Sequence, residues 1–407
     1  MTRQTDAVAP IVPIAAYAHA PLLLLLIGLL MLQPLSTDLY LASLPHLATS
    51  FSVPASKVQL TLSMFVAAFG GAQLVIGPLS DRHGRRPVLI AGLALYVGAS
   101  LLCAAAPGID LLIVARFLQA LGCCSAIIIA RAIVRDAWAP ADSAGVIARA
   151  SSWLSLAPLL GPILGSYLQV SFGWRAAFVA HSILGACLLA AVMLRLPETN
   201  AHKNPRATEL AGLFENFRLV LGARAFWASA LSYGAIFAFI SGSSLALIGV
   251  LRVPTAWFGY CFAFGVSGYL GGTILCRHLL PKFGQAVTQR IGATASLAAG
   301  ALFLAALALG AVHWALVVAA MFLMMGAHGI NFPVAQSGAV TPFPRQAGTA
   351  AGLMGALAMA VAFLVGTVTG ATFDGTLTPL AAIVCALGAA IFASVRLLGA
   401  PLPQVAR

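Results

Sequence analysis

The chain has 407 residues, of which 61% are hydrophobic and only 8% charged, and its formal net charge is +12. Soluble domains carry about 25% charged residues, so this composition excludes an ordinary soluble protein, and the high apolar content excludes intrinsic disorder. The basic side chains fall in short clusters between apolar stretches, without a continuous basic patch, which excludes nucleic acid as a partner.

A membrane-spanning helix needs about 20 apolar residues, and the chain holds twelve such stretches bounded by Pro, Gly and charged residues. Six of them lie over residues 17–44, 56–79, 87–106, 110–133, 143–169 and 175–196. The other six lie over residues 224–250, 256–279, 288–310, 313–337, 346–371 and 377–398. We therefore predict an all-α membrane protein with 12 transmembrane helices in two pseudo-symmetric six-helix bundles.

A polar stretch divides the two sets of spans. The expected organisation is an N-terminal tail over 1–16, a first bundle over 17–196, a linker over 197–223, a second bundle over 224–398 and a tail over 399–407. A weak repeat supports two related halves, because Asp81-Arg82-x-Gly84 after the second span is followed 200 residues later by Pro281-Lys282-x-Gly284. Duplicated halves are typical of transporters, whose substrate site lies near mid-membrane between them.

The distribution of positive charge predicts the orientation. If the N-terminus is cytoplasmic, 18 of the 22 Lys and Arg residues fall in cytoplasmic segments. Three, Lys57, Arg175 and Arg252, fall outside, and Arg116 lies within a span. Because cytoplasmic loops are enriched in Lys and Arg, we expect a multi-pass protein with both termini in the cytoplasm.

Two charged side chains clearly lie inside predicted spans, Asp38 in the first and Arg116 in the fourth. An intramembrane charge is costly and normally faces a cavity or a partner. We interpret Asp38 as the acid that exchanges protons, with Arg116 facing the same cavity, modulating Asp38 and contacting substrate. The alternatives are that Asp38 meets water near the outer end of its span, and that Arg116 binds carbonyl groups of neighbouring helices.

Other polar and aromatic side chains within spans are candidates for a substrate pocket beside these two charges. They are Gln33, Ser36 and Tyr40 in the first span, Gln59 and Ser63 in the second, Gln119 in the fourth, Tyr233 and Phe237 in the seventh, and Asn331 in the tenth. For each of them, helix packing is the competing interpretation.

The segment Gly77-Pro-Leu-Ser-Asp81-Arg82-His83-Gly84-Arg85-Arg86 follows the second span. It closely resembles the cytoplasmic loop motif between helices 2 and 3 of major facilitator superfamily (MFS) transporters. The resemblance implies a gating role for Gly77, Asp81, Arg82, Gly84, Arg85 and Arg86. Its acid is expected to pair with basic residues and a helix N-terminus across the interface between the halves, here near residues 346–352.

Three further motifs agree with this resemblance. Arg116-x-x-Gln119 resembles the Arg-x-x-Gln-Gly motif of helix 4, with Ala120 in place of the last Gly. The run from Ala157 through Gly161, Pro162 and Gly165 to Ser166 resembles the helix-5 motif of antiporters, which implies gating by Gly161, Pro162 and Gly165. Thr37-Asp38-Leu39-Tyr40 with Pro45 resembles the helix-1 motif of the bacterial Bcr/CflA branch of drug–proton antiporters.

The resemblance covers essentially the whole chain and implies a monomeric secondary transporter of the bacterial inner membrane. It would export small amphipathic drugs, such as chloramphenicol-like or bicyclomycin-like antibiotics, in exchange for protons by alternating access. Its expected partners are thus the small-molecule substrate, protons and the lipid bilayer. An MFS importer or uniporter of a small metabolite is the alternative.

A membrane-embedded enzyme is a remote third interpretation. The sequence lacks His-Glu-x-x-His and Gly-x-Ser-x-Gly, and no cluster of acids lies within a span. The seven cysteines lie in apolar stretches without metal-ligand spacing. We therefore expect a protein that is not an enzyme and needs neither a cofactor nor a metal.

Overall fold

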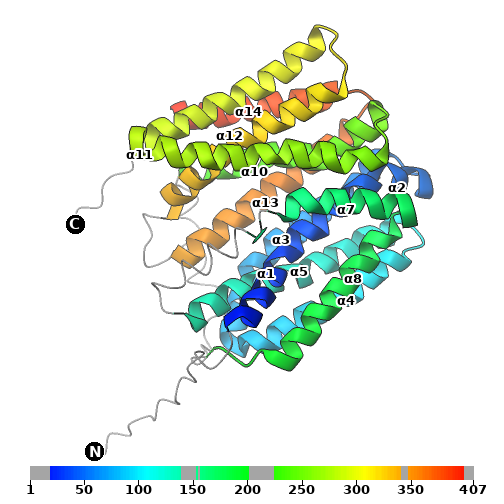
Figure 1. The fold of residues 1–407 in the computed structure, drawn as a ribbon, viewed down its shortest axis with the longest axis vertical. Coiled ribbons are helices and arrows are strands. Elements are labelled where there is room, and N and C mark those ends of the chain that lie inside the picture. The colour runs from blue at the N-terminus through cyan, green and yellow to red at the C-terminus, as the bar shows by residue number, and fades with distance from the viewer. Residues whose placement is uncertain (1–18, 139–152, 155, 201–223, 341–346, 398–407) are drawn as a thin grey trace, which may run out of the picture.

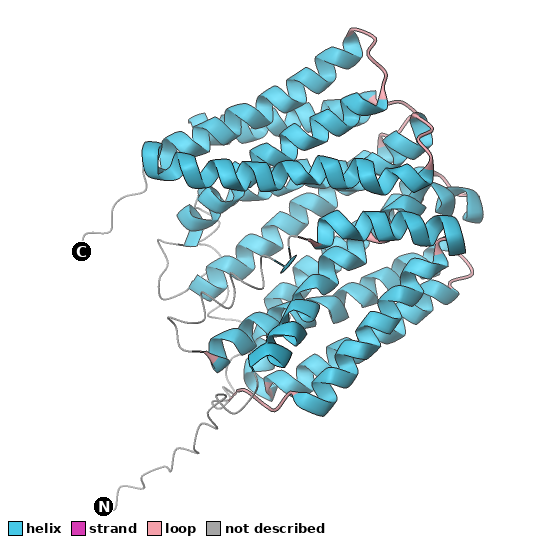
Figure 2. Ribbon diagram, in the orientation of Figure 1, coloured by secondary structure: helices cyan, strands magenta, loops and turns pink. Residues whose placement is uncertain are grey.

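The computed structural model describes residues 19–138, 153–154, 156–200, 224–340 and 347–397, and these residues form helices joined by short turns (Figures 1 and 2). The first half contains α1 (His19–Asp38), the 3-10 turn η2 (Leu41–Ser43), α2 (Leu44–Phe51), α3 (Ala55–His83), α4 (Arg85–Ala105), α5 (Ile109–Ala137), α7 (Ala157–Phe172) and α8 (Arg175–Arg195). The second half contains α10 (Arg224–Ser244), the π-helix η3 (Leu245–Val250), α11 (Thr255–Ala308), α12 (Trp314–Val340), α13 (Ala347–Ala371) and α14 (Thr378–Leu397).

The helices match the prediction of a multi-span protein. Within the described ranges, ten helical stretches are long and apolar enough to cross a bilayer. One of them, α11, has 54 residues and turns back on itself at Gly284, where φ is 73°, so it supplies two spans (Figure 1). The 16-residue α7 covers the second part of the predicted fifth span, whose first part lies outside the described residues. Many large apolar side chains lie on the outer surface, with Leu24 68% and Phe172 70% exposed, as contact with lipid requires.

The internal repeat seen in the sequence is also visible in the backbone. Residues with positive φ recur at almost constant spacing in the two halves. The pairs are Ser52 and Arg252 (52° and 56°), Gly84 and Gly284 (107° and 73°), and Gly173 and Gly375 (78° and 84°). Two of these pairs are 200 residues apart and the third is 202 apart, so matching turns connect matching helices.

The two bundles meet through two pairs of long helices, α3 with α13 and α7 with α11 (Figure 1). Small residues allow close approach there: a Cβ placed on Gly259 of α11 would lie 2.5 Å from the Cα of Ile163 in α7. At the end of the molecule that carries α2, His46 Nε2 lies 3.0 Å from Thr255 Oγ1. The bundles are therefore joined by direct contacts of backbone and side chains.

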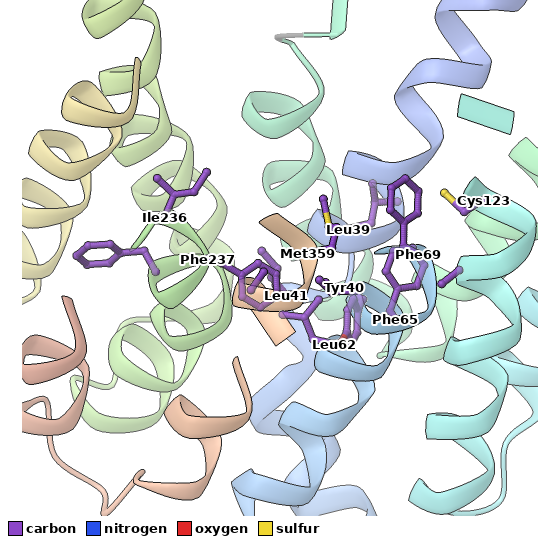
Figure 3. Close-up of a cluster of buried hydrophobic side chains, with 14 of the residues drawn as sticks. Leu39, Tyr40, Leu41, Leu62, Phe65, Phe69, Cys123, Ile236, Phe237 and Met359 are labelled. Atoms are coloured by element: carbon purple, nitrogen blue, oxygen red, sulfur yellow. The ribbon is translucent and has the colours of Figure 1, made fainter. Parts of the chain in front are cut away.

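A continuous apolar core extends across this junction. Figure 3 shows Leu41, Leu62 and Phe65 of the first half near Phe237 and Met359 of the second. Several polar residues that the sequence singles out, among them Asp38, Gln59 and Arg116, are buried as well, which makes their hydrogen-bond partners decisive for their role.

Candidate functional site at the break in α1

The first span is interrupted in its middle. The α1 helix ends at Asp38, and the chain then passes through the 3-10 turn Leu41–Ser43 before α2 continues to Phe51. Pro34 within α1 lacks a backbone N–H, and the Thr37 hydroxyl donates to the Pro34 carbonyl oxygen at 2.9 Å. Such side-chain bonds to the preceding turn favour bending of a helix. The break exposes backbone polar groups within a membrane span, the arrangement found where transporters bind substrates and ions.

Asp38 is the last residue of α1 and is only 5% exposed. Its carboxylate accepts a hydrogen bond of 2.9 Å from the Thr37 hydroxyl, and no cation lies within ion-pair distance of it in the described part of the chain. Tyr233, which α10 brings from the other half, interacts with both Asp38 and Gln33. The candidate acid therefore lies in the core where the two halves meet.

Arg116 of α5 is fully buried and hydrogen-bonds to groups around the break. Its Nη1 donates to the carbonyl oxygen of Ser36 at 3.0 Å and to Oε1 of Gln119 at 2.6 Å. The guanidinium also lies 4.5 Å from the ring centroid of Tyr40 and 4.2 Å from that of Phe65. Arg116 and Asp38 form no ion pair among the described residues, and the modulation of Asp38 by Arg116 stays a proposal.

The physical reason lies in the end of α1. The last carbonyl groups of a helix lack partners in the following turn, and Ser36 is two residues from that end. Arg116 supplies a charged donor to this carbonyl, so the contact stabilises the break. This geometry corresponds to the alternative interpretation of Arg116, in which it binds carbonyl groups of neighbouring helices.

A network of buried hydroxyl and amide groups surrounds the same break. Ser36 Oγ lies 2.7 Å from the hydroxyl of Tyr96, and Tyr40 Oη lies 2.9 Å from Thr61 Oγ1. Gln119 Nε2 donates to Ser100 Oγ at 2.7 Å. The structure thus brings Ser36, Tyr40, Arg116 and Gln119 together, as the sequence predicted, and adds three partners that sequence reasoning missed: Thr61, Tyr96 and Ser100.

His181 of α8 is a further residue that the sequence analysis missed. It is 1% exposed, and its Nε2 lies 3.1 Å from the carbonyl oxygen of Leu35, one turn before Leu39. A lone histidine inside an apolar span is the signal that could have identified it. It places an imidazole beside the break, from a helix that carries none of the predicted pocket residues.

The small residues of α7 lie directly against the break. A Cβ on Gly161 would lie 3.1 Å from the Cβ of Asp38, and one on Gly165 would overlap the carbonyl group of Leu39. On the other side of α7, the backbone at Pro162 contacts Gly259 of α11. The α7 motif is therefore packed between the candidate acid and the second half.

The remaining predicted pocket residues divide into two groups. Gln59 Nε2 donates to the Ser241 carbonyl oxygen at 2.6 Å, and Ser63 lies against Gly366, so both side chains of α3 face the second half. Phe237 stacks on Tyr233 with ring centroids 6.5 Å apart. These residues surround the junction that contains Asp38.

Asn331 lies elsewhere. Its Nδ2 donates to Ser296 Oγ at 3.0 Å, and its side chain packs against Gly292 on the second part of α11. Asn331 thus hydrogen-bonds to a neighbour within its own half, and its place in the substrate pocket stays a proposal.

The segment 77–86 connects α3 to α4 through Gly84, whose positive φ permits the turn. Asp81 forms an ion pair with Arg85, and Arg85 Nε donates to Asp136 Oδ2 of α5 at 2.9 Å. This cluster lies within the first half. The expected target of Asp81 across the interface begins outside the described residues at 346, and the side chains of 347–351 are not described.

Gly77, Arg82 and Arg86 occupy the same end of the bundle. Gly77 packs 4.0 Å from Ile128 when a Cβ is placed on it, and Arg82 is exposed at the end of α3. Beside them, Glu198 accepts hydrogen bonds from the backbone N–H groups of Arg85 and Arg86, at 2.8 and 3.2 Å. A carboxylate at the N-terminus of α4 is electrostatically favourable, and sequence reasoning did not assign this role to Glu198.

These features define a polytopic helical protein with two related bundles and a broken first span at their junction. Residues 26–367 match the family model described as the Major Facilitator Superfamily. The chain belongs to this superfamily, whose members are membrane transporters and not enzymes.

Three bacterial relatives are similar over most of their length. The chain is 28% identical to the bicyclomycin resistance protein homolog of Haemophilus influenzae, covering 88% of this chain and 91% of the relative. It is 33% identical to a chloramphenicol resistance protein of Pseudomonas aeruginosa (82% and 80% covered). It is 29% identical to multidrug resistance protein D of Escherichia coli (83% and 85% covered). The resemblance to the bicyclomycin and chloramphenicol branch is thereby confirmed.

Solved structures show the same fold at lower identity. A D-xylose–proton symporter superimposes with a TM-score of 0.71 at 17% identity, covering 92% of this chain and 96% of that chain. A bacterial homolog of the human lysosomal transporter Spinster, in an inward-facing and unoccupied conformation, gives a TM-score of 0.66 at 19% identity, with 94% and 95% covered.

Proposed function

We propose that this MFS transporter exports small amphipathic drugs from the cytoplasm in exchange for protons, with Asp38 as the proton-exchanging acid. The observation that carries the proposal is the buried Asp38 carboxylate, which ends a broken helix at the junction of the halves and forms no ion pair with any described residue. A membrane carboxylate that forms no ion pair is costly to keep charged. We therefore expect it to take up or release a proton according to which side of the membrane it is open to. The names of the relatives support a drug as the substrate.

The proposed mechanism is alternating access, in which two bundles rock about the core that contains Asp38. Tyr233 and Phe237 of the second half lie beside this core, so a substrate bound there would contact both bundles. Protons and substrate compete for, or alternate at, this site. The glycines of α7 hold the backbone of the break against the interface and therefore transmit its rearrangement.

The segment 77–86 is proposed to stabilise the closed cytoplasmic side. We place this end of the bundle, and both chain termini, in the cytoplasm of a bacterial inner-membrane protein because positive charge concentrates there. The cluster of Asp81, Arg85 and Asp136 would hold the ends of α3, α4 and α5 together while the bundles move. The working unit is expected to be a monomer.

The test uses purified protein in liposomes that contain a pH-sensitive dye, with an imposed proton gradient and a panel of antibiotics and metabolites. We expect drug-evoked proton movement with wild type and none with Asp38→Asn, which preserves shape and removes the exchangeable proton. Substrate uptake without proton movement, equal in both proteins, would instead establish the alternative, a facilitator of small metabolites. A matched control is Asp110→Asn, because Asp110 forms an exposed ion pair with Lys57 far from the break.

A further inference from the structure

A groove lies on the outer flank of the first bundle, between the start of α4 and the end of α8. Its volume is about 870 Å³. It is lined by Arg86, Pro87, Ile90, Ala91, Met193, Leu194, Arg195, Leu196, Pro197 and Glu198. In Figure 1, α4 and α8 form the flank farthest from α11 and α14, and none of the lining residues is among those described above as contacting the break in α1.

The wall of this groove has the chemistry of a lipid-facing surface. Met193 and Leu194 are 53% and 82% exposed, and Ile183, further along α8, is 60% exposed. Pro87 and Ala91 are exposed on the facing side of α4. Apolar side chains so exposed on a membrane protein lie against acyl chains, and the groove therefore opens toward the bilayer.

The charged end of the groove carries two cations, Arg86 and Arg195. Arg86 Nη2 donates to the Met193 carbonyl oxygen at 2.9 Å, but its Nε is buried without a hydrogen-bond partner among the described residues. Arg195 is exposed and forms no ion pair within those residues. The exposed guanidinium of Arg195 can therefore approach an anion directly, and the half-buried Arg86 adds a second positive charge at this end of the groove.

The acid in the groove is held by backbone donors and not by these two cations. Glu198 Oε1 accepts from the backbone N–H groups of Arg85 and Asn200, at 2.8 and 2.9 Å, and Oε2 accepts from that of Arg86. Because the carboxylate is occupied by the N-terminus of α4 and by its own turn, it forms no ion pair with Arg86 or Arg195.

We infer that this groove binds one anionic phospholipid of the cytoplasmic leaflet. The phosphate would lie between Arg86 and Arg195, where a guanidinium can form paired hydrogen bonds with phosphate oxygens, and the acyl chains would lie along Ile90, Ala91 and Leu194. A lipid held there joins α4 to α8 beside the segment 77–86. The position of the headgroup depends on the orientation given above, but the binding itself does not depend on drug export.

The test is native mass spectrometry of the delipidated full chain with equal amounts of phosphatidylglycerol and phosphatidylcholine that have identical acyl chains. We expect wild type to retain phosphatidylglycerol selectively. Each Arg near an anionic lipid contributes about five-fold in binding, so Arg86→Gln with Arg195→Gln is expected to retain it about 25-fold more weakly. The control removes the same two charges at the exposed Arg277 and Arg290 of α11 and is expected to bind like wild type.

Two single variants test the same binding site if the double variant does not fold. Arg195→Gln alone removes no hydrogen bond formed among the described residues and is expected to weaken retention about five-fold. Ala91→Trp leaves every charge in place but fills the apolar part of the groove, and is expected to exclude the lipid. Equal retention of both lipids by wild type, or equal loss in the groove and control variants, would overturn the inference. Because retention is measured without a drug or a proton gradient, failure of the proposed antiport leaves this result unaffected.

Discussion

His181 of α8 lies 3.1 Å, measured from its Nε2, from the carbonyl oxygen of Leu35 in the last turn of α1. A carbonyl oxygen only accepts, so Nε2 carries the hydrogen and Nδ1 is left as an acceptor. That Nδ1 has no partner among the described residues. The ring meets Phe178 edge-on, with centroids 5.9 Å apart, so packing and one hydrogen bond fix α8 against the turn that carries Asp38.

The role of this contact can be tested by replacing the imidazole. His181→Leu removes the donor, and we expect it to cost about 1 kcal/mol of stability and to slow drug-evoked proton movement. His181→Gln retains an amide donor near the position of Nε2 and is expected to restore both. Thermal unfolding in detergent and the liposome assay measure the two effects. Equal behaviour of the Leu and Gln variants would mean that only the volume of the side chain matters.

The packing of α7 on the break gives a second prediction. A Cβ at Gly165 would overlap the Leu39 carbonyl group, which belongs to the backbone and cannot move aside cheaply. Gly165→Ala is therefore expected to destabilise the protein by about 1 to 3 kcal/mol and to reduce transport. Gly71→Ala is the matched control, because its Cβ would meet open space and Ala favours the helix. A melting temperature of Gly165→Ala at or above that of the control would contradict this packing argument.

Arg116 gives a third prediction, which separates a structural role from an electrostatic one. Arg116 Nη1 donates to both Ser36 and Gln119, while Nε donates to the Thr61 carbonyl oxygen at 3.4 Å; Lys keeps the charge but has no second nitrogen for Thr61. We expect Arg116→Lys to lose about 1 to 3 kcal/mol of stability, while the folded fraction transports with an unchanged pH midpoint. Unfolding curves and pH-dependent transport rates provide the measurement. A shifted midpoint in the folded protein would instead indicate that Arg116 modulates Asp38.

The turn between α13 and α14 predicts a dependence of stability on pH. Thr376 donates to Asp374 through its backbone N–H and its hydroxyl, at 2.9 and 2.7 Å, and these bonds hold the pKa of that exposed carboxyl below its ordinary value of 3.8. A carboxyl with a lower pKa in the folded state stabilises the protein above its unfolded pKa and loses that contribution as pH falls. We expect this contribution at neutral pH and its decline below about pH 4, with Asp374→Asn less sensitive between pH 7 and pH 3. An identical decline of melting temperature in both proteins would count against it.

Much of the fold could be predicted because a bilayer imposes a length and a composition on every span. The residues Ser36, Tyr40, Arg116 and Gln119 could also be assigned to one region, because polar groups within spans gather where helices meet. Their partners could not, since the direction of Arg116 depends on where α1 ends. That end is set by Pro34, by the Thr37 hydroxyl and by the packing of α7, none of which follows from hydropathy.

The other differences between the predicted and the observed contacts arise because the sequence does not show which neighbour each face of a helix meets. Asn331 is as polar as Gln59, yet α12 turns it toward Ser296 while α3 turns Gln59 toward Ser241. A hydropathy window does not distinguish these faces. His181 was missed for a related reason: a single polar residue in an apolar run has no pattern, and its importance comes only from the carbonyl group it meets.

The turn at Gly284 gives the second bundle a particular mechanical property. Two spans of α11 follow one another without an intervening loop, and the first of them packs against α7 beside Asp38. Because the turn is so tight, the two helices of this hairpin are expected to move together and not independently of each other. Displacement of α11 at the junction is then conveyed along the hairpin to Gly292 and Ser296, on the far side of the bundle, where Asn331 is bonded.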